Sequence, residues 1–189
     1  LDESRVDDLA KGYSSRVHGP ERVEIEHIDT FAESAATGFY SIASDVTDYF
    51  QEHLDGDDRL LTDLSKRRMR QVQWTISDEA RYGLGLSITK VNGRTYYGHS
   101  GGYPGHITMS KLDLDRRLSI SVFTNANDGP AGTLTSGILE LIDTATANYL
   151  AYVQDQSDQL LKKTAEFVDL YKSGKDDEAR ALYAVARVH

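Results

Sequence analysis

An Asn-Gly pair at residues 92 and 93 lies between two stretches in which apolar and polar residues alternate, YGLGLSITKV and RTYYGHSGG. Alternation with a period of two is typical of a half-buried strand, and Asn-Gly favours the tight turn between antiparallel strands. Two more alternating stretches, GHITMSKLD and RLSISVFTN, follow with a turn expected at residues 113–116. The sequence therefore predicts an antiparallel sheet built from two hairpins.

Two short helices are expected before the sheet, because apolar residues there recur every three to four positions. The first spans residues 41–54, with Ser41 or Ser44 as its N-cap and Asp45 in its first turn. The second begins near Thr62. The residues expected to face inward are Val46, Tyr49, Phe50, Leu54, Leu64 and Met69.

Helical periodicity returns after the sheet at Thr133 and continues until Gly174, beyond which Asp176 or Asp177 can cap a last helix. The first thirty residues are polar, and a loop-rich segment with one short strand is expected there. This order of elements indicates an α+β fold, an antiparallel sheet of two hairpins with flanking helices, followed by a C-terminal helical hairpin.

One change in composition divides the chain: near residues 144–150 glycine becomes rare, and glutamine, lysine and aspartate become common. We therefore expect one domain over residues 1–147 and a helical hairpin tail over residues 148–189. The chain begins with Leu1 and has no signal-peptide pattern, so we expect a processed product or an excised part of a longer protein.

Composition excludes several classes of function. The formal net charge of −9 argues against nucleic-acid binding, and Lys66, Arg67, Arg68 and Arg70 are expected to form a solvated face. There are no cysteines, so disulfides and thiolate metal sites are excluded. No apolar run approaches the ~20 residues of a membrane span.

The string GHSGG at residues 98–102 matches Gly-x-Ser-x-Gly, the turn that carries the nucleophile of α/β-hydrolases. That turn needs a helix directly after the serine. Here Gly-Gly-Tyr-Pro-Gly follows Ser100 and cannot open one, and the only later histidines are His106 and His189. Ser100 is therefore not expected to be a nucleophile, and the two glycines instead offer unobstructed backbone N–H groups to a ligand.

Four segments occur in a fixed order and spacing: AKGY, TGFYSIASDVTDYF, YGLGL and VNGRTYYGHSGGYPGHITMSKLDLDRRLSISVFTN. Their combination is more specific than any one of these motifs. In this the sequence resembles the penicillin-recognising serine hydrolases, which include class C-type β-lactamases, D-alanyl-D-alanine carboxypeptidases and related esterases. The resemblance covers about residues 9–143. It implies a partial β-lactamase/transpeptidase-like fold and a periplasmic or extracellular location.

In that family a Lys-Thr-Gly motif, or a variant such as His-Ser-Gly, lies on the strand that borders the active site. The resemblance implies that His99, Ser100 and Gly101 form this substrate-binding motif. It also implies that the backbone N–H of Gly102 donates to the oxyanion. Asn125 matches a position that helps to hold polar groups of the substrate, although a turn residue at a strand end is an equal alternative.

The family's nucleophile lies in a Ser-x-x-Lys motif and its partner in Tyr-x-Asn, and both precede AKGY in the family order. In this chain the only notable Ser-x-x-Lys, residues 87–90, falls in a strand pattern. The resemblance therefore implies the C-terminal part of a serine hydrolase that acts on β-lactam, D-amino-acid peptide or ester substrates through an acyl-enzyme. The chain supplies the His-Ser-Gly wall and the oxyanion strand, without the nucleophile and without a cofactor. The expected partners are a small-molecule or peptide substrate and the missing N-terminal part.

The tail, YVQDQSDQLLKKTAEFVDLYKSGKDDEARALYAVARVH, resembles the opening helical hairpin of imelysin-like modules in periplasmic iron-uptake proteins. This favours an alternative of another class, a non-catalytic binding or structural module linked to metal uptake. A hairpin packed on the hydrolase part, or an oligomerisation arm, fits the same pattern.

No metal site is expected from the histidines. Surface positions are expected for His18, His27 and His53. His99 and His106 are seven residues apart across a Gly-Pro turn, which is not a ligand spacing, and His189 has no partners at helical spacing.

Overall fold

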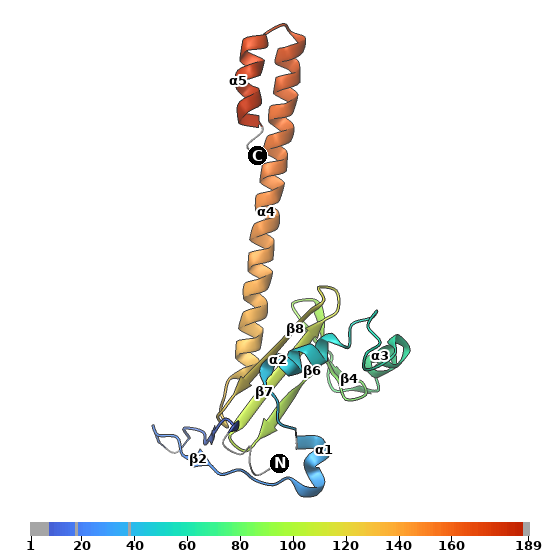
Figure 1. Cartoon of the computed structure of the whole chain (residues 1–189), viewed down its shortest axis with the longest axis vertical. Coiled ribbons are helices and arrows are strands. Elements are labelled where there is room, and N and C mark those ends of the chain that lie inside the picture. Colours follow the sequence, from blue (N-terminus) through green and yellow to red (C-terminus); the bar gives the residue numbers. More distant parts are fainter. Residues whose placement is uncertain (1–7, 18, 38, 187–189) are drawn as a thin grey trace. The chain divides into compact units, whose positions relative to one another are not determined.

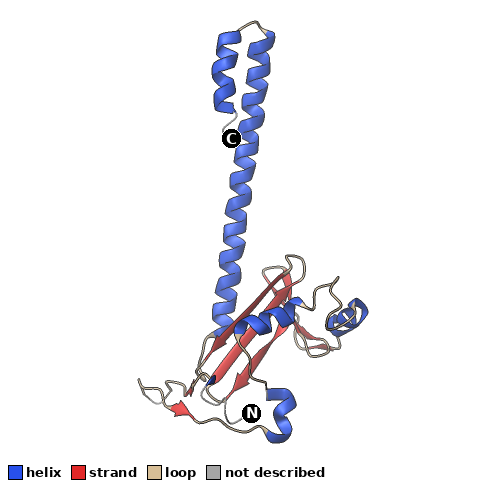
Figure 2. Cartoon of the chain, viewed as in Figure 1, coloured by secondary structure: helices blue, strands red, loops and turns tan. Residues whose placement is uncertain are grey.

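The computed structural model describes residues 8–17, 19–37 and 39–186, and the chain divides into two compact units, Leu1–Gly137 and Ile138–His189. All strands of the described residues lie in the first unit, and the second unit is helical (Figure 1, Figure 2). This mixed architecture confirms the predicted α+β class.

A six-stranded antiparallel sheet forms the centre of the first unit, and its strands are neighbours in chain order. They are β3 (Trp74–Thr75), β4 (Ala80–Tyr82), β5 (Ser87–Val91), β6 (Arg94–Tyr103), β7 (His106–Asp113) and β8 (Leu118–Thr124). The predicted hairpins are β5–β6 and β7–β8. The sequence pattern did not indicate β3 and β4, because strands of two and three residues are too short for alternation to show.

Both predicted hairpin turns are present. Asn92 and Gly93 have φ of 50° and 77°, the left-handed values that a two-residue turn between twisted strands requires. In the second turn the Asp113 carboxylate accepts hydrogen bonds from the backbone N–H of Arg116 at 3.1 Å and from its Nε at 2.7 Å. These two turns join β5 to β6 and β7 to β8.

Helix α2 (Ala43–Gln51) packs against β7 and β8 and lies across one face of the sheet (Figure 1). Its N-cap is Ile42, without a side-chain cap bond, so the prediction that Ser41 or Ser44 caps it is wrong. Asp45 lies in the first turn, as predicted. The buried core consists of Phe50, Leu54, Leu86 and Leu112, with Val46, Met69, Tyr97 and Leu114 packed against it.

The segment before α2 is rich in loops, as predicted, but it contains two short strands where one was expected. Strands β1 (Gly12–Tyr13) and β2 (Glu24–Ile25) pair with each other, and a 3₁₀ turn (Phe31–Glu33) leads into α1 (Ser34–Thr37). Tyr13 also bridges to Ala126 after β8. The N-terminal segment is thereby attached to the end of the sheet where β8 stops.

Helix α3 (Asp63–Arg70) begins where predicted, with Thr62 accepting a hydrogen bond from the N–H of Ser65. The prediction of a solvated basic face holds for Arg67 and Arg68, which are exposed. It is wrong for Lys66, which is fully buried and whose Nζ donates to the carbonyls of Leu54, at 2.8 Å, and Asp57. Leu64, predicted to face inward, is exposed instead. The lysine occupies the inner face because the loop after α2 turns carbonyl groups toward it.

His53 is also buried, which contradicts its predicted place on the surface. Its Nδ1 donates to the Tyr49 carbonyl at 3.1 Å, while its Nε2 has no hydrogen-bond partner among the described residues. Burial lowers the pKa of His53, and the nearby cations of Lys66 and Arg70 lower it further, against the effect of the Tyr49 bond.

The second unit begins inside α4 (Ala131–Lys172), a continuous helix, and continues through a turn at Gly174 into α5 (Asp176–Ala186). The rings of Phe167 and Tyr183 lie 5.7 Å apart between the two helices. The predicted C-terminal helical hairpin is therefore present, and the domain boundary predicted at residues 147–148 falls inside α4. None of the helices in the described ranges combines the length and apolarity of a membrane span.

Candidate functional site

The residues singled out by the sequence motif lie on β6, where the strand loses one of its neighbours. Strand β5 pairs with β6 only as far as Gly98, which lies opposite Ser87. From His99 to Tyr103 the described residues provide a single neighbouring strand, β7. We call residues 99–103 the open edge of β6.

Backbone groups along an antiparallel strand point alternately to its two sides. Tyr103 and His106 face each other across the two-residue turn at Pro104-Gly105, so their backbone groups bond to each other. By alternation the N–H and C=O groups of Ser100 and Gly102 point away from β7. The open edge therefore offers the Ser100 N–H and both backbone groups of Gly102 to a ligand, while the Ser100 carbonyl accepts from Nδ1 of His99.

Steric crowding explains why residue 101 is a glycine. A Cβ atom at Gly101 would lie 2.3 Å from Oγ1 of Thr108 on β7, whereas one at Gly102 would meet only Cδ1 of Ile107, at 3.8 Å. Gly101 thus permits close packing of β6 on β7. The space beside Gly102 is therefore open to a ligand.

His99 is held by two hydrogen bonds within the chain. Its Nδ1 bonds to the Ser100 carbonyl, which can only accept, and its Nε2 lies 2.8 Å from the Tyr82 hydroxyl on β4. The two rings meet edge to face at 5.7 Å. The ring is therefore oriented by Tyr82, which lies on a strand that the sequence did not reveal.

Ser100 is exposed, and its hydroxyl makes no hydrogen bond to another of the described residues. The chain continues as a strand from Ser100 to Tyr103, so no helix begins after the serine. Neither ring nitrogen of His99 is placed to take its proton. This geometry agrees with the sequence argument against a nucleophile at Ser100.

A cluster of rings that sequence analysis missed closes the far end of the open edge. The Tyr103 hydroxyl lies 2.8 Å from Nδ1 of His27, and it accepts a hydrogen bond from the N–H of Ile28 at 2.7 Å. Nε2 of His27 lies 2.7 Å from the Tyr40 hydroxyl. Helix α1, between these residues in sequence, lies close to β6. His27 is exposed, as predicted, and no local motif marks these contacts because they join distant segments.

Asn125 lies away from the open edge, after β8 and two strands from β6, a separation of roughly 10 Å at ordinary strand spacing. Its Nδ2 donates to the Lys11 carbonyl at 3.1 Å, which ties down the segment before β1. The structure thus does not bring Asn125 together with His99, Ser100 and Gly102. The contact of Asn125 with Lys11 instead fits the alternative, a turn residue at the end of a strand.

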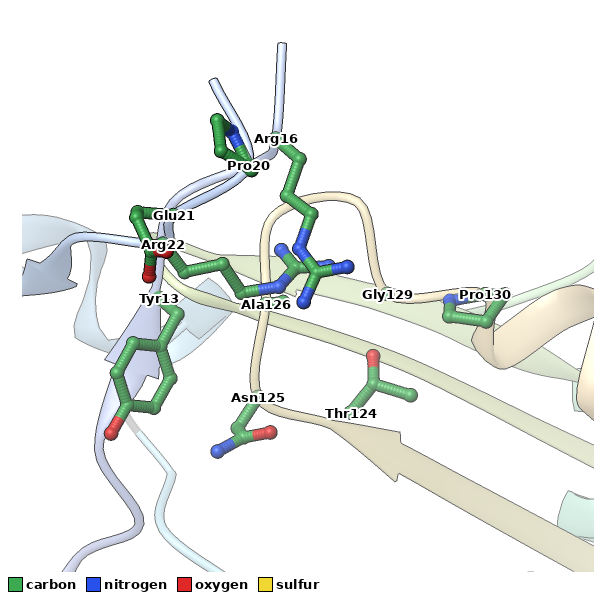
Figure 3. A pocket seen from close by; sticks show the side chains of 10 residues that line it. All are labelled: Tyr13, Arg16, Pro20, Glu21, Arg22, Thr124, Asn125, Ala126, Gly129 and Pro130. Carbon is green, nitrogen blue, oxygen red and sulfur yellow. The ribbon is translucent and has the colours of Figure 1, made fainter. Parts of the chain in front are cut away.

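Asn125 instead lines a separate pocket of about 510 Å³ between the N-terminal segment and the loop after β8 (Figure 3). The other lining residues are Tyr13, Arg16, Pro20, Glu21, Arg22, Thr124, Ala126, Gly129 and Pro130. Arg22 pairs with Asp128, and this contact, with the N–H of Arg16, lowers the pKa of the Asp128 carboxyl. The Asp128 carboxylate thereby partly neutralises the positive charge that Arg22 brings to the pocket.

Within the described ranges no three metal-ligating side chains cluster. His106 lies 3.1 Å, through Nε2, from the Ala10 carbonyl, which gives that ring a role in holding the N-terminal segment. His18 and His189 lie outside the described residues.

Comparisons with known proteins place these elements in a family. A family model described as Beta-lactamase matches residues 1–142. No curated protein matches the chain. The family match ends inside α4, and the imelysin-like resemblance of the tail stays a prediction.

Several solved structures resemble the chain, among them the following three. A D-stereospecific amidohydrolase from Streptomyces sp. is 24% identical, with 62% of this chain and 35% of that chain covered and a TM-score of 0.54. SurE is 24% identical, with 64% and 29% covered and a TM-score of 0.55. A penicillin binding protein from Bacillus halodurans is 23% identical, with 43% and 26% covered and a TM-score of 0.40. The chain spans about a third of the length of the first two structures, and at this identity they show the fold alone.

Proposed function

The chain belongs to the beta-lactamase family, and from this premise we propose that it forms one wall of a serine hydrolase active site. The substrates are β-lactams, D-amino-acid peptides or esters, which react through an acyl-enzyme, and the enzyme acts in the periplasm or outside the cell. The observation that carries the proposal is the open edge of β6, where the His-Ser-Gly motif coincides with unpaired backbone groups.

An extended substrate can lie along this edge as an additional strand would. The Ser100 hydroxyl is free to donate to, or accept from, a polar group of the substrate. The Gly102 N–H points to the side where a reacting carbonyl oxygen would lie, and it stabilises the negative charge that develops there. The ring cluster around Tyr103 limits the length of substrate that the edge accepts.

The nucleophile comes from outside these 189 residues, in the Ser-x-x-Lys motif that the family places before AKGY. Its oxygen forms a bond to the substrate carbonyl carbon, the bond to the leaving group breaks, and the leaving group takes up a proton. The open edge contributes by holding the substrate and stabilising the oxyanion.

His99 occupies the position at which a lysine-bearing relative holds a permanent positive charge. An imidazole does not hold the permanent charge of a lysine, and both ring nitrogens of His99 are already bonded, to Ser100 and Tyr82. We therefore expect a weak β-lactamase and a better esterase or D-amino-acid peptidase.

Replacing His99 in the complete protein tests this selectivity. His99→Lys is expected to raise the ratio of kcat/KM for a cephalosporin to that for a short-chain aryl ester by about tenfold, the value of one additional charge pair of ~1.4 kcal/mol. Tyr82→Phe is the control, because it frees the imidazole without adding a charge. An unchanged ratio in His99→Lys would show that residue 99 does not face the substrate, and a wild type that prefers the cephalosporin would contradict the selectivity argument.

A non-catalytic module is the second candidate, favoured by the observation that Ser100 has no base and that Ser87 to Lys90 lie in β5. Its link to metal uptake rests on the tail resemblance alone. The gene sequence before Leu1 separates the two candidates, since Ser-x-x-Lys followed by Tyr-x-Asn is required for the enzyme. In either case the 189-residue chain is expected to remain unlabelled by a fluorophosphonate probe, and an adduct on Ser100 would overturn the site assignment.

A further inference from the structure

The middle of α4 carries apolar residues at alternating spacings of seven and four positions, Ile142, Tyr149, Val153 and Leu160, which we call the α4 stripe. Tyr149, Val153 and Leu160 are 66%, 39% and 43% exposed. Residues at this spacing lie on one side of a helix, and this side forms the seam of a coiled coil when a second helix packs on it. Among the described residues, no helix covers it.

The same side of α4 is already a helix interface further along. Beyond Leu160 the row passes through Lys163 to Phe167 and Leu170, and the last two are half-buried. Here α5 lies antiparallel to α4 (Figure 1), with the Tyr183 ring against Phe167. The α4 stripe is therefore the uncovered continuation of an existing antiparallel interface.

The positions beside the stripe also suit a buried interface. Between residues 142 and 160 the flanking positions are Asp143, Ala145, Leu150, Tyr152, Ser157 and Gln159, and only the first is charged. Asp155 and Asp158 lie on the other faces of the helix. Scarcity of charge and abundance of tyrosine are typical of the centre of a protein–protein interface.

We propose that the α4 stripe binds the same segment of a second copy of this chain, with the two helices antiparallel. A two-fold axis at the level of residue 151 brings Ile142 opposite Leu160 of the other copy, and Tyr149 opposite Val153. The polar residues of the row, Thr146 and Gln156, then also meet each other. A symmetric interface requires that one surface be complementary to itself, and this pairing satisfies that requirement at every layer.

Sedimentation of the full chain tests the dimer. The wild type is expected to be dimeric at micromolar concentration, and the double variant Tyr149→Glu/Val153→Glu is expected to weaken the dimer at least about a hundredfold, since it brings four carboxylates together at the axis. Leu161→Glu is the matched control: Leu161 is 72% exposed on another face of α4, and its replacement should leave the dimer intact. Helical circular dichroism of each variant separates dissociation from unfolding. A monomeric wild type, or a dimer that persists in a folded double variant, would overturn the proposal.

Disulfide trapping tests the orientation, because the chain has no cysteine of its own. Leu150→Cys lies beside the axis and is expected to cross-link two identical copies. Leu160→Cys alone is expected not to cross-link, whereas a mixture of Ile142→Cys and Leu160→Cys chains should give the mixed dimer. Efficient cross-linking of Leu160→Cys to itself would show a parallel pair and contradict the antiparallel arrangement.

Discussion

Two regions of the first unit differ in whether their polar groups find hydrogen-bond partners within the chain. Around Lys66 the groups are enclosed, and the buried ammonium donates to two backbone carbonyls of the loop after α2. Along the open edge of β6 the groups are accessible, one side of the strand has no neighbouring strand among the described residues, and the Ser100 hydroxyl is exposed. Enclosed and satisfied polar groups hold a fold together, whereas accessible and unsatisfied ones are available to a ligand.

The comparison predicts that substitutions in the two regions have opposite effects. Substitution of Lys66 should alter the stability of the fold without changing the reaction at the open edge. Changes at Gly102 should alter the reaction of the complete protein with little effect on stability.

The largest effect on stability is expected for Lys66→Ala. It leaves the carbonyls of Leu54 and Asp57 buried without a donor and removes a well-packed side chain, which should lower the free energy of unfolding by about 3 kcal/mol. Arg67→Ala is the control on the same helix, since 62% of the Arg67 side chain is exposed, and it should change stability by less than ~0.5 kcal/mol. Chemical denaturation of both variants is the measurement, and equal losses would contradict an enclosed role for Lys66.

A smaller, pH-dependent effect is expected at His53, whose pKa is lowered chiefly by burial. In acid the unfolded chain then binds a proton that the folded chain excludes. The stability from His53 is fully present above the unfolded pKa of about 6.5 and is lost as the pH falls toward the lower folded pKa, at up to ~1.4 kcal/mol per pH unit.

Denaturation between pH 7.5 and pH 5 is therefore expected to show a decline in wild-type stability that His53→Gln reduces. His27→Gln, at an exposed histidine, is the control and should leave the decline in place. A decline of the same size in His53→Gln would mean that other groups cause it.

Much of the sheet could be predicted because short stretches of sequence specify its strands and turns. Asn92-Gly93 and the alternating residues around it specify the first hairpin without reference to distant parts of the chain. The burial of Lys66 could not be predicted in this way, since it depends on carbonyl groups that α2 and its loop bring to α3. Charged residues in a helix usually face solvent, and the exception arises from tertiary packing.

The candidate site divides in the same manner. The glycines after Ser100 and the family resemblance together pointed to the end of β6, and the pairing of strands shows why that end is open. The hydroxyl that orients His99 belongs to Tyr82 on β4, a strand too short to be recognised in the sequence. Asn125 could not be placed relative to β6 from its sequence position, because its separation depends on the order of strands in the sheet.

The most direct test of the open edge is the removal of a single N–H group in the complete protein. Gly102→Pro deletes the N–H that points away from β7, and proline is tolerated at an unpaired strand edge. Gly102→Ala is the control, because it keeps the N–H and its Cβ meets only Ile107 at 3.8 Å. The proline variant is expected to fold and to lose about 100-fold or more in kcat for an ester substrate, while the alanine variant keeps most of it. A folded proline variant that is as active as the alanine variant would contradict the assignment of Gly102 to the oxyanion.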